Sequence, residues 1–124
     1  MKNGRIAIPT EGSGGLEAIR SGHFGHCSVF TLIDIKDGEI INVETVPNQE
    51  HREGGCLVPV NILANAGADT LIVGGMGTRP LIGFNQAGIK VYYETTQPSV
   101  KAALEMYING KLPEMMPQNA CGGH

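Results

Sequence analysis

The dipeptide Asp37-Gly38 restricts the fold most, because it stands between two strand-like runs of the chain. Residues 27–35 and 39–46 are rich in β-branched side chains, which favour strands. Asp-Gly is a strong signal for the two-residue turn of a β-hairpin, whose central residues need positive φ. The sequence therefore predicts two antiparallel strands joined at this turn.

The rest of the chain predicts one strand before the hairpin and an alternation of helices and strands after it. The first strand covers residues 5–8, and we expect Pro9 to close it. Later apolar runs predict strands at 70–74 and 89–93, and the segments between and after them predict helices at 57–66, 79–87 and 98–108. Each predicted helix is followed by a glycine, a common C-terminal signal: Gly67, Gly88 and Gly110. The predicted N-caps are Thr78 for the second helix and Thr96 or Gln97 for the third.

This β-β-β-α-β-α-β-α order predicts an α/β fold, with a five-stranded mixed sheet flanked by three helices. With 124 residues, we expect a single domain over 1–112 and a flexible tail over 113–124. The net charge of -3 and the scarcity of aromatic residues argue against a nucleic-acid partner. No secretory signal or membrane-spanning apolar stretch is visible, so we expect a cytoplasmic protein with no membrane partner.

The cysteines and histidines fall in three short segments of the sequence. They are the only residues of these types: His23, His26 and Cys27; His51 and Cys56; Cys121 and His124. Transition metals prefer such ligands, so all seven are candidate metal ligands. Simpler readings stay open, because Cys27 could be a buried hydrophobe and either neighbouring histidine could bond a backbone carbonyl. The Cys121/His124 pair is only half of a closed zinc site, and could equally be a disordered end, a metal-delivery hook or a lid.

Strand direction predicts that the first two of these segments meet. The second strand begins at the edge where the first one ends, and the third strand returns to that edge before His51 and Cys56. If the fourth strand is parallel to the first, the loop containing Gly75, Met76 and Gly77 lies there too. Ligands bind at this carboxyl edge in open α/β sheets.

Backbone amides of glycine-rich loops could contribute to the same site. The candidates for binding a cofactor in this way are Gly25, Gly55, Gly75, Met76 and Gly77. Cys56 is expected near a helix N-terminus, where the helix dipole favours the thiolate form. That state suits either a metal ligand or a nucleophile.

Several segments resemble one known family across essentially the whole chain. They are Ser21-Gly22-His23-Phe24-Gly25, His51 with Gly54-Gly55, Leu71-Ile72-Val73-Gly74-Gly75-Met76-Gly77, and Tyr107-Ile108-Asn109-Gly110-Lys111-Leu112. The chain resembles a small stand-alone member of the dinitrogenase iron–molybdenum cofactor biosynthesis family, which includes NifX and the NifB C-terminal-like domain. The resemblance implies a ribonuclease-H-like topology and non-catalytic carriage of a metal–sulfur cluster. Only His23 matches a family position directly.

The resemblance thus implies a cluster containing Fe, with Mo or Cu as further candidates and Zn as the alternative metal. It also implies donor and acceptor proteins for that cluster as partners, and it leaves the oligomeric state open. One alternative is a Cys-dependent enzyme with Cys56 as nucleophile and His51 or His23 as base. Another is an interaction domain in which the histidines have no metal-binding role.

Overall fold

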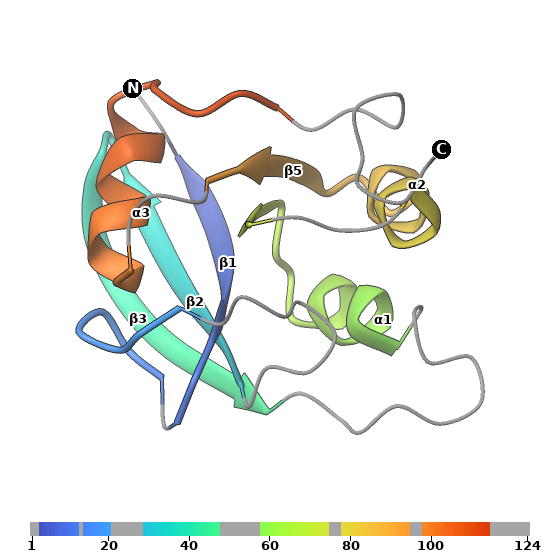
Figure 1. Cartoon of the computed structure of the whole chain (residues 1–124), viewed down its shortest axis with the longest axis horizontal. Helices are drawn as coiled ribbons and strands as arrows, with labels where there is room; N and C mark the ends of the chain where they lie inside the picture. The colour runs from blue at the N-terminus through green and yellow to red at the C-terminus, as the bar shows by residue number, and fades with distance from the viewer. Residues whose placement is uncertain are drawn as a thin grey trace.

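The structure, a computed structural model, describes residues 3–12, 14–20, 29–47, 58–74, 78–94 and 98–114. Five strands and three helices occur in these ranges, in the predicted order (Figure 1). They are β1 (Gly4–Thr10), β2 (Val29–Lys36), β3 (Glu39–Pro47), α1 (Val58–Asn65), β4 (Thr70–Val73), α2 (Thr78–Gln86), β5 (Lys90–Tyr93) and α3 (Val100–Ile108). The predicted α/β class and its five-stranded mixed sheet with three helices are confirmed.

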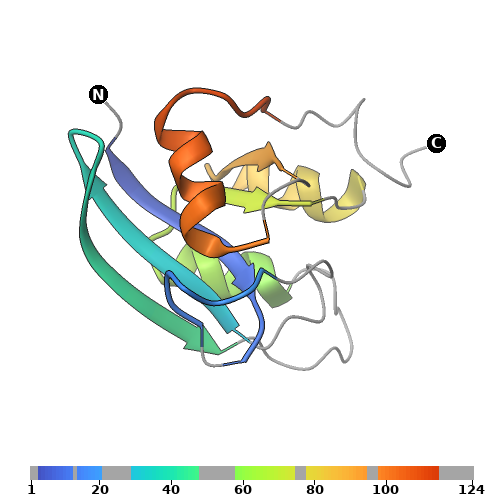
Figure 2. The ribbon, with the colours of Figure 1, turned by 60° about the vertical axis from the view of Figure 1, so that its left-hand side comes forward.

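The strands form one sheet in the order β3-β2-β1-β4-β5. β2 is antiparallel to both β1 and β3, whereas β4 is parallel to β1 and β5 is parallel to β4. β1, β3, β4 and β5 therefore all run in one direction, and only β2 runs against them. Figure 2 shows the arrows of β1 and β3 ending at the same side of the sheet.

Alternating side chains of the strands feed two separate cores, one on each face of the sheet. In β1, Ala7 packs into the core that includes α1 and α2, and its neighbours Ile6 and Ile8 pack into the core under α3. Phe84 of α2 and Leu104 of α3 are fully buried in these two cores. The result is a three-layer arrangement with α1 and α2 on one face and α3 on the other (Figure 1).

The turn signals act as the sequence predicts. Asp37 and Gly38 have φ of 53° and 79°, as expected for the turn between β2 and β3. Gly67, Gly88 and Gly110 also have positive φ, and each follows a helix. At each of them the amide of the following residue bonds a carbonyl of the last helical turn, for example Lys111 N to Met106 O at 2.9 Å. These paired bonds are the Schellman pattern, which satisfies carbonyls that a helix end would otherwise leave without partners.

Two local predictions are wrong. Pro9 does not close β1, because Pro9 and Thr10 continue the ladder opposite Phe30 and Val29. β4 pairs with β1 only at Ile6 and Ala7, so at Pro9 the strand has a ladder partner on one side only and tolerates a missing N–H.

The third helix also begins later than predicted. Its N-cap is Ser99, rather than Thr96 or Gln97, and the Ser99 hydroxyl accepts a hydrogen bond from the Ala102 amide at 3.2 Å. A serine next to the first helical residue satisfies one of the amides that have no partner within the helix.

Candidate functional site

Four strands end at one edge of the sheet, and a fifth begins there. Thr10 lies opposite Val29, which in turn lies opposite Pro47, so the end of β1, the start of β2 and the end of β3 are adjacent. Val73 and Tyr93 end the paired β4 and β5 on the same side. We call this edge, marked by these five residues, the carboxyl rim.

The predicted site residues all lie outside the described residues. They are His23, Gly25, His26, Cys27, His51, Gly55, Cys56, Gly75, Met76, Gly77, Cys121 and His124. Three of the segments that contain these residues are flanked by described residues. These flanking residues lie at the carboxyl rim or in the helix that follows it. Residues 21–28 precede β2, residues 48–57 connect β3 to α1, and residues 75–77 connect β4 to α2. The strand register therefore implies that these segments leave from one edge of the sheet. It stays a prediction that their side chains form one site.

A buried ion pair lies at this rim. Arg20 Nη1 is 2.9 Å from Glu94 Oε1, and the two side chains are only 7% and 3% exposed. Arg20 Nη2 also donates to the backbone carbonyl of Glu94 at 2.8 Å. Burial lowers the pKa of the Arg20 guanidinium, and the Glu94 charge opposes that shift.

The backbone around this pair joins several parts of the rim. The Arg20 amide donates to Pro98 O, and the Glu94 amide donates to Val73 O, both at 2.8 Å. Arg20 also forms an antiparallel bridge with Thr10 at the end of β1. The pair therefore ties the residue that precedes the His23 segment to the ends of β1, β4 and β5.

A second polar contact fixes the loop after β1. The Thr10 hydroxyl donates to Ile8 O at 2.7 Å and lies 2.9 Å from the Thr31 hydroxyl, and both threonines are fully buried. Thr31 Oγ1 in turn accepts a hydrogen bond from the Gly15 amide at 3.1 Å. Gly14 approaches the strands so closely that an added Cβ would lie 2.7 Å from Thr45 Cγ2.

Sequence reasoning did not identify the polar residues that hold this loop. Gly14 and Gly15, in the same loop, have φ of 79° and 104°, backbone angles that glycine adopts readily. Arg20 and Glu94 carry no local motif, and they lie 74 positions apart in the sequence. No signal in a single sequence joins them.

The chain beyond α3 returns to the sheet. Tyr93 N donates to Pro113 O at 3.0 Å, and Glu114 forms an antiparallel bridge with Tyr92. The first residues of the predicted tail are thus bonded along β5. Seven further residues lead to Cys121, a reach of about 23 Å at about 3.3 Å per extended residue.

Within residues 3–12, 14–20, 29–47, 58–74, 78–94 and 98–114, no three His, Cys, Asp or Glu side chains are grouped in a way that could hold a metal ion. Among the helices in these ranges, none has the length and apolar character needed to cross a membrane.

The fold and the polar rim define a small α/β domain in which four strands end and a fifth begins at one sheet edge. The sequence profile of the family "Dinitrogenase iron-molybdenum cofactor" matches residues 4–110, which is most of the chain. The chain belongs to this family.

A curated relative and two solved structures support this assignment. "Uncharacterized protein MJ0580" of Methanocaldococcus jannaschii is 31% identical over 110 residues, which cover 87% of this chain and 88% of that protein. The apo form of the orange protein from Desulfovibrio gigas has a TM-score of 0.79 at 27% identity, covering 92% of this chain and 94% of that one. A putative NifB protein from Thermotoga has a TM-score of 0.71 at 29% identity, covering 90% and 92%.

Proposed function

We propose that this protein binds and carries a metal–sulfur cluster at its carboxyl rim, without catalysing a reaction. The strand register is the observation that carries the proposal. It makes three segments that contain cysteine, histidine or glycine-rich sequence begin or end at the same edge of the sheet. Membership in an iron–molybdenum cofactor family supports a metal cluster as the ligand of that edge.

The residue types in these segments suit a cluster as cargo. His23, His26, Cys27, His51 and Cys56 supply imidazole nitrogen and thiolate, which bind iron, copper and zinc. Amides of Gly25, Gly55 and residues 75–77 are suited to hydrogen bonds with the anionic sulfur atoms of a cluster. We assign Fe as the principal metal, with Mo or Cu as further components and Zn as the alternative.

The described residues supply a rigid base for this site. Arg20 directly precedes the segment that contains His23, and its buried pair with Glu94 holds it against the ends of β4 and β5. The Thr10–Thr31 contact holds the preceding loop in the same way. A fixed base limits how far the following ligands move, and such preorganisation favours binding.

The proposal extends to partners and to the tail. Cargo of this kind has to arrive from one metallocluster-handling protein and leave to another, and we place this exchange in the cytoplasm. We assign Cys121 and His124, in the tail of residues 113–124, as accessory ligands rather than as part of the main set. We assign residues 1–112 to the domain proper.

Elemental analysis and absorption spectroscopy test the proposal on protein purified without oxygen. The same measurements are repeated after anaerobic reconstitution, first with iron and sulfide only and then with molybdate, copper or zinc added as well. We expect bound iron and a sulfur-to-metal charge-transfer spectrum, both strongly reduced in His23→Ala and Cys56→Ala. Gln86→Ala, on an exposed position of α2 away from the rim, is the matched control and should keep full metal content.

Two results would contradict the proposal. The first is a chain that stays free of Fe, Mo, Cu and Zn after reconstitution. The second is a Cys56→Ala variant with unchanged metal content, which would leave Cys56 available for the alternative role of an enzymatic nucleophile.

A further inference from the structure

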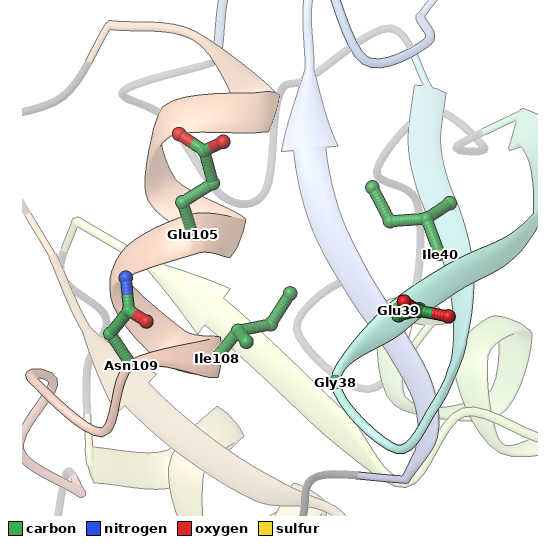
Figure 3. Close-up of a pocket in the computed structure, with 6 residues that line it drawn as sticks. All are labelled: Gly38, Glu39, Ile40, Glu105, Ile108 and Asn109. Carbon is green, nitrogen blue, oxygen red and sulfur yellow. The ribbon is translucent and has the colours of Figure 1, made fainter.

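A groove separates the C-terminal half of α3 from the β2–β3 hairpin (Figure 3). It has a volume of about 740 Å³ and is lined by Gly38, Glu39, Ile40, Glu105, Ile108 and Asn109. We call it the hairpin groove. The hairpin turn follows the end of β2, where Ile35 lies opposite Gly4 at the start of β1. The groove is therefore at the opposite edge of the sheet from the carboxyl rim.

The interior of the groove is apolar. Ile40 and Ile108 extend into it from opposite sides (Figure 3). Ile40 is 37% exposed, and it continues into an apolar strip on β3 with Val43, which is 36% exposed. Ile40 and Val43 lie opposite Ile35 and Ile33, whose side chains pack on the α3 face, so the strip and the groove share that face. Adjacent exposed apolar side chains of this kind are typical of interaction sites.

The charged residues that line the groove are both acidic, and Lys36 lies opposite one of them, Glu39, in the β2–β3 ladder. Glu39 lies on the hairpin side and Glu105 on α3, and neither forms an ion pair within the described part of the chain. The C-terminal end of α3, at Ile108 and Asn109, adds the partial negative charge of a helix C-terminus. These charges favour a cationic group in the groove.

We propose that the hairpin groove is a docking surface for a partner protein segment that presents an aliphatic side chain flanked by lysine or arginine. The aliphatic group would pack between Ile40 and Ile108, and the basic groups would pair with Glu39 and Glu105. The Asn109 amide, which lines the same groove, is placed to bond a polar group of that segment.

A second copy of this chain fits the groove less well. A twofold dimer places the same patch of both copies face to face, so the acidic residues of one groove would approach those of the other. Like charges at such short range are unfavourable, and the chain already carries a net charge of -3. Charge complementarity therefore selects a basic partner.

The position of the groove has a functional consequence. Because it lies at the edge opposite the carboxyl rim, a docked partner leaves the rim accessible. This inference does not depend on the proposed cluster site and is tested separately from it.

Peptide titration of the isotope-labelled full chain, followed by nuclear magnetic resonance at low salt, tests the proposal. The probe is a synthetic amphipathic helical peptide of leucine and lysine, compared with a counterpart in which every lysine is glutamate. We expect the lysine peptide to shift the amide signals of residues 38–40 and 105–109, and the glutamate peptide to leave them unmoved.

Charge-reversal variants make this test specific. We expect Glu39→Lys/Glu105→Lys to weaken binding by about tenfold or more, because each exposed pair contributes roughly a twofold to fivefold effect and its reversal adds repulsion. Glu11→Lys/Glu17→Lys changes the net charge equally at exposed positions before the rim, and should bind almost as well as the parent chain. Ile40→Asn should also weaken binding, since it removes one apolar wall.

Three results would overturn the proposal. One is that signal shifts fall outside the groove. Another is that both charge-reversal variants lose affinity equally, which would indicate general attraction to an acidic protein. The third is a concentration-dependent dimer, seen by sedimentation, that Ile40→Asn abolishes, which would assign the groove to a second copy of the chain.

Discussion

The substitution Glu94→Gln tests whether the buried ion pair stabilises the rim. It keeps the size of the side chain and one hydrogen-bond acceptor, but it removes the charge that faces Arg20. The guanidinium would then remain in a position where its side chain is only 7% exposed, without a compensating carboxylate. A buried charge that loses its counter-ion is strongly destabilising.

The magnitude follows from burial. Removing one partner of a buried pair costs about 3–5 kcal/mol, whereas an exposed pair contributes about 0.2–1 kcal/mol. The pair of Arg5 with Asp34 offers a matched control, because its Nε–Oδ1 distance is 2.7 Å but its side chains are 30% and 22% exposed. A loss of 3–5 kcal/mol is a large part of the roughly 5–15 kcal/mol that stabilises a typical domain.

Urea unfolding followed by circular dichroism measures both effects. With a denaturant slope of about 2 kcal/mol per molar urea, Glu94→Gln should lower the midpoint by about 2 M, and Asp34→Asn by less than about 0.5 M. Equal shifts for the two variants would refute the reasoning. The double variant Arg20→Met/Glu94→Met should recover most of the loss, because it leaves no buried charge.

The same variant connects stability to the proposed function. Under conditions where Glu94→Gln remains folded, we expect it to take up less metal on reconstitution than Asp34→Asn does. The reason is that Arg20 directly precedes the segment containing His23. Unchanged metal content in folded Glu94→Gln would show that the ion pair supports the fold alone.

Three further predictions concern local features. The hydrogen bond from Arg5 lowers the pKa of the Asp34 carboxyl below 3.8. The contribution of Asp34 to stability is therefore present above about pH 4 and is lost as the pH falls through the folded-state pKa. The difference in urea midpoint between the parent chain and Asp34→Asn should shrink in acid, and a constant difference would contradict this. Gly14→Ala should lower the free energy of unfolding by more than about 2 kcal/mol, because the φ of Gly14 is 79° and the new Cβ would lie 2.7 Å from a β3 methyl group. Gly12 has a φ of 62° but open space around it, so Gly12→Ala should lower it by only about 1 kcal/mol in the same assay. Ser99→Ala removes the N-cap of α3 and should cost about 1 kcal/mol, which thermal unfolding would detect, and no loss would indicate that another group caps the helix.

Much of the secondary structure could be predicted because its signals are local. The Asp37-Gly38 turn and the glycines after the helices depend on backbone angles that neighbouring residues cannot easily override. Pro9 shows the limit of this reasoning. Proline stays within β1 because β4 pairs with that strand only at Ile6 and Ala7, and the extent of that pairing is a property of the sheet.

The candidate site divides in the same way. The cysteine, histidine and glycine segments could be chosen from the sequence, since residue type alone indicates metal chemistry. Strand direction also predicted that these segments share one edge. The parallel pairing of β4 with β1 confirms the strand direction on which this depends, and the placement of the segments themselves stays a prediction. The polar residues that brace this edge could not be predicted, because Thr10 and Thr31, like Arg20 and Glu94, have no motif and meet only across the fold.

The sequence by itself determined the order of strands and helices, the hairpin turn, the C-terminal ends of the helices and the kinds of chemistry available to the chain. Only the tertiary structure decided that Arg20 and Glu94 form a buried pair, and that β3 and α3 leave a groove between Glu39 and Glu105. The physical reason is that local backbone preferences act between neighbours. Burial and charge pairing depend on which distant segments pack together.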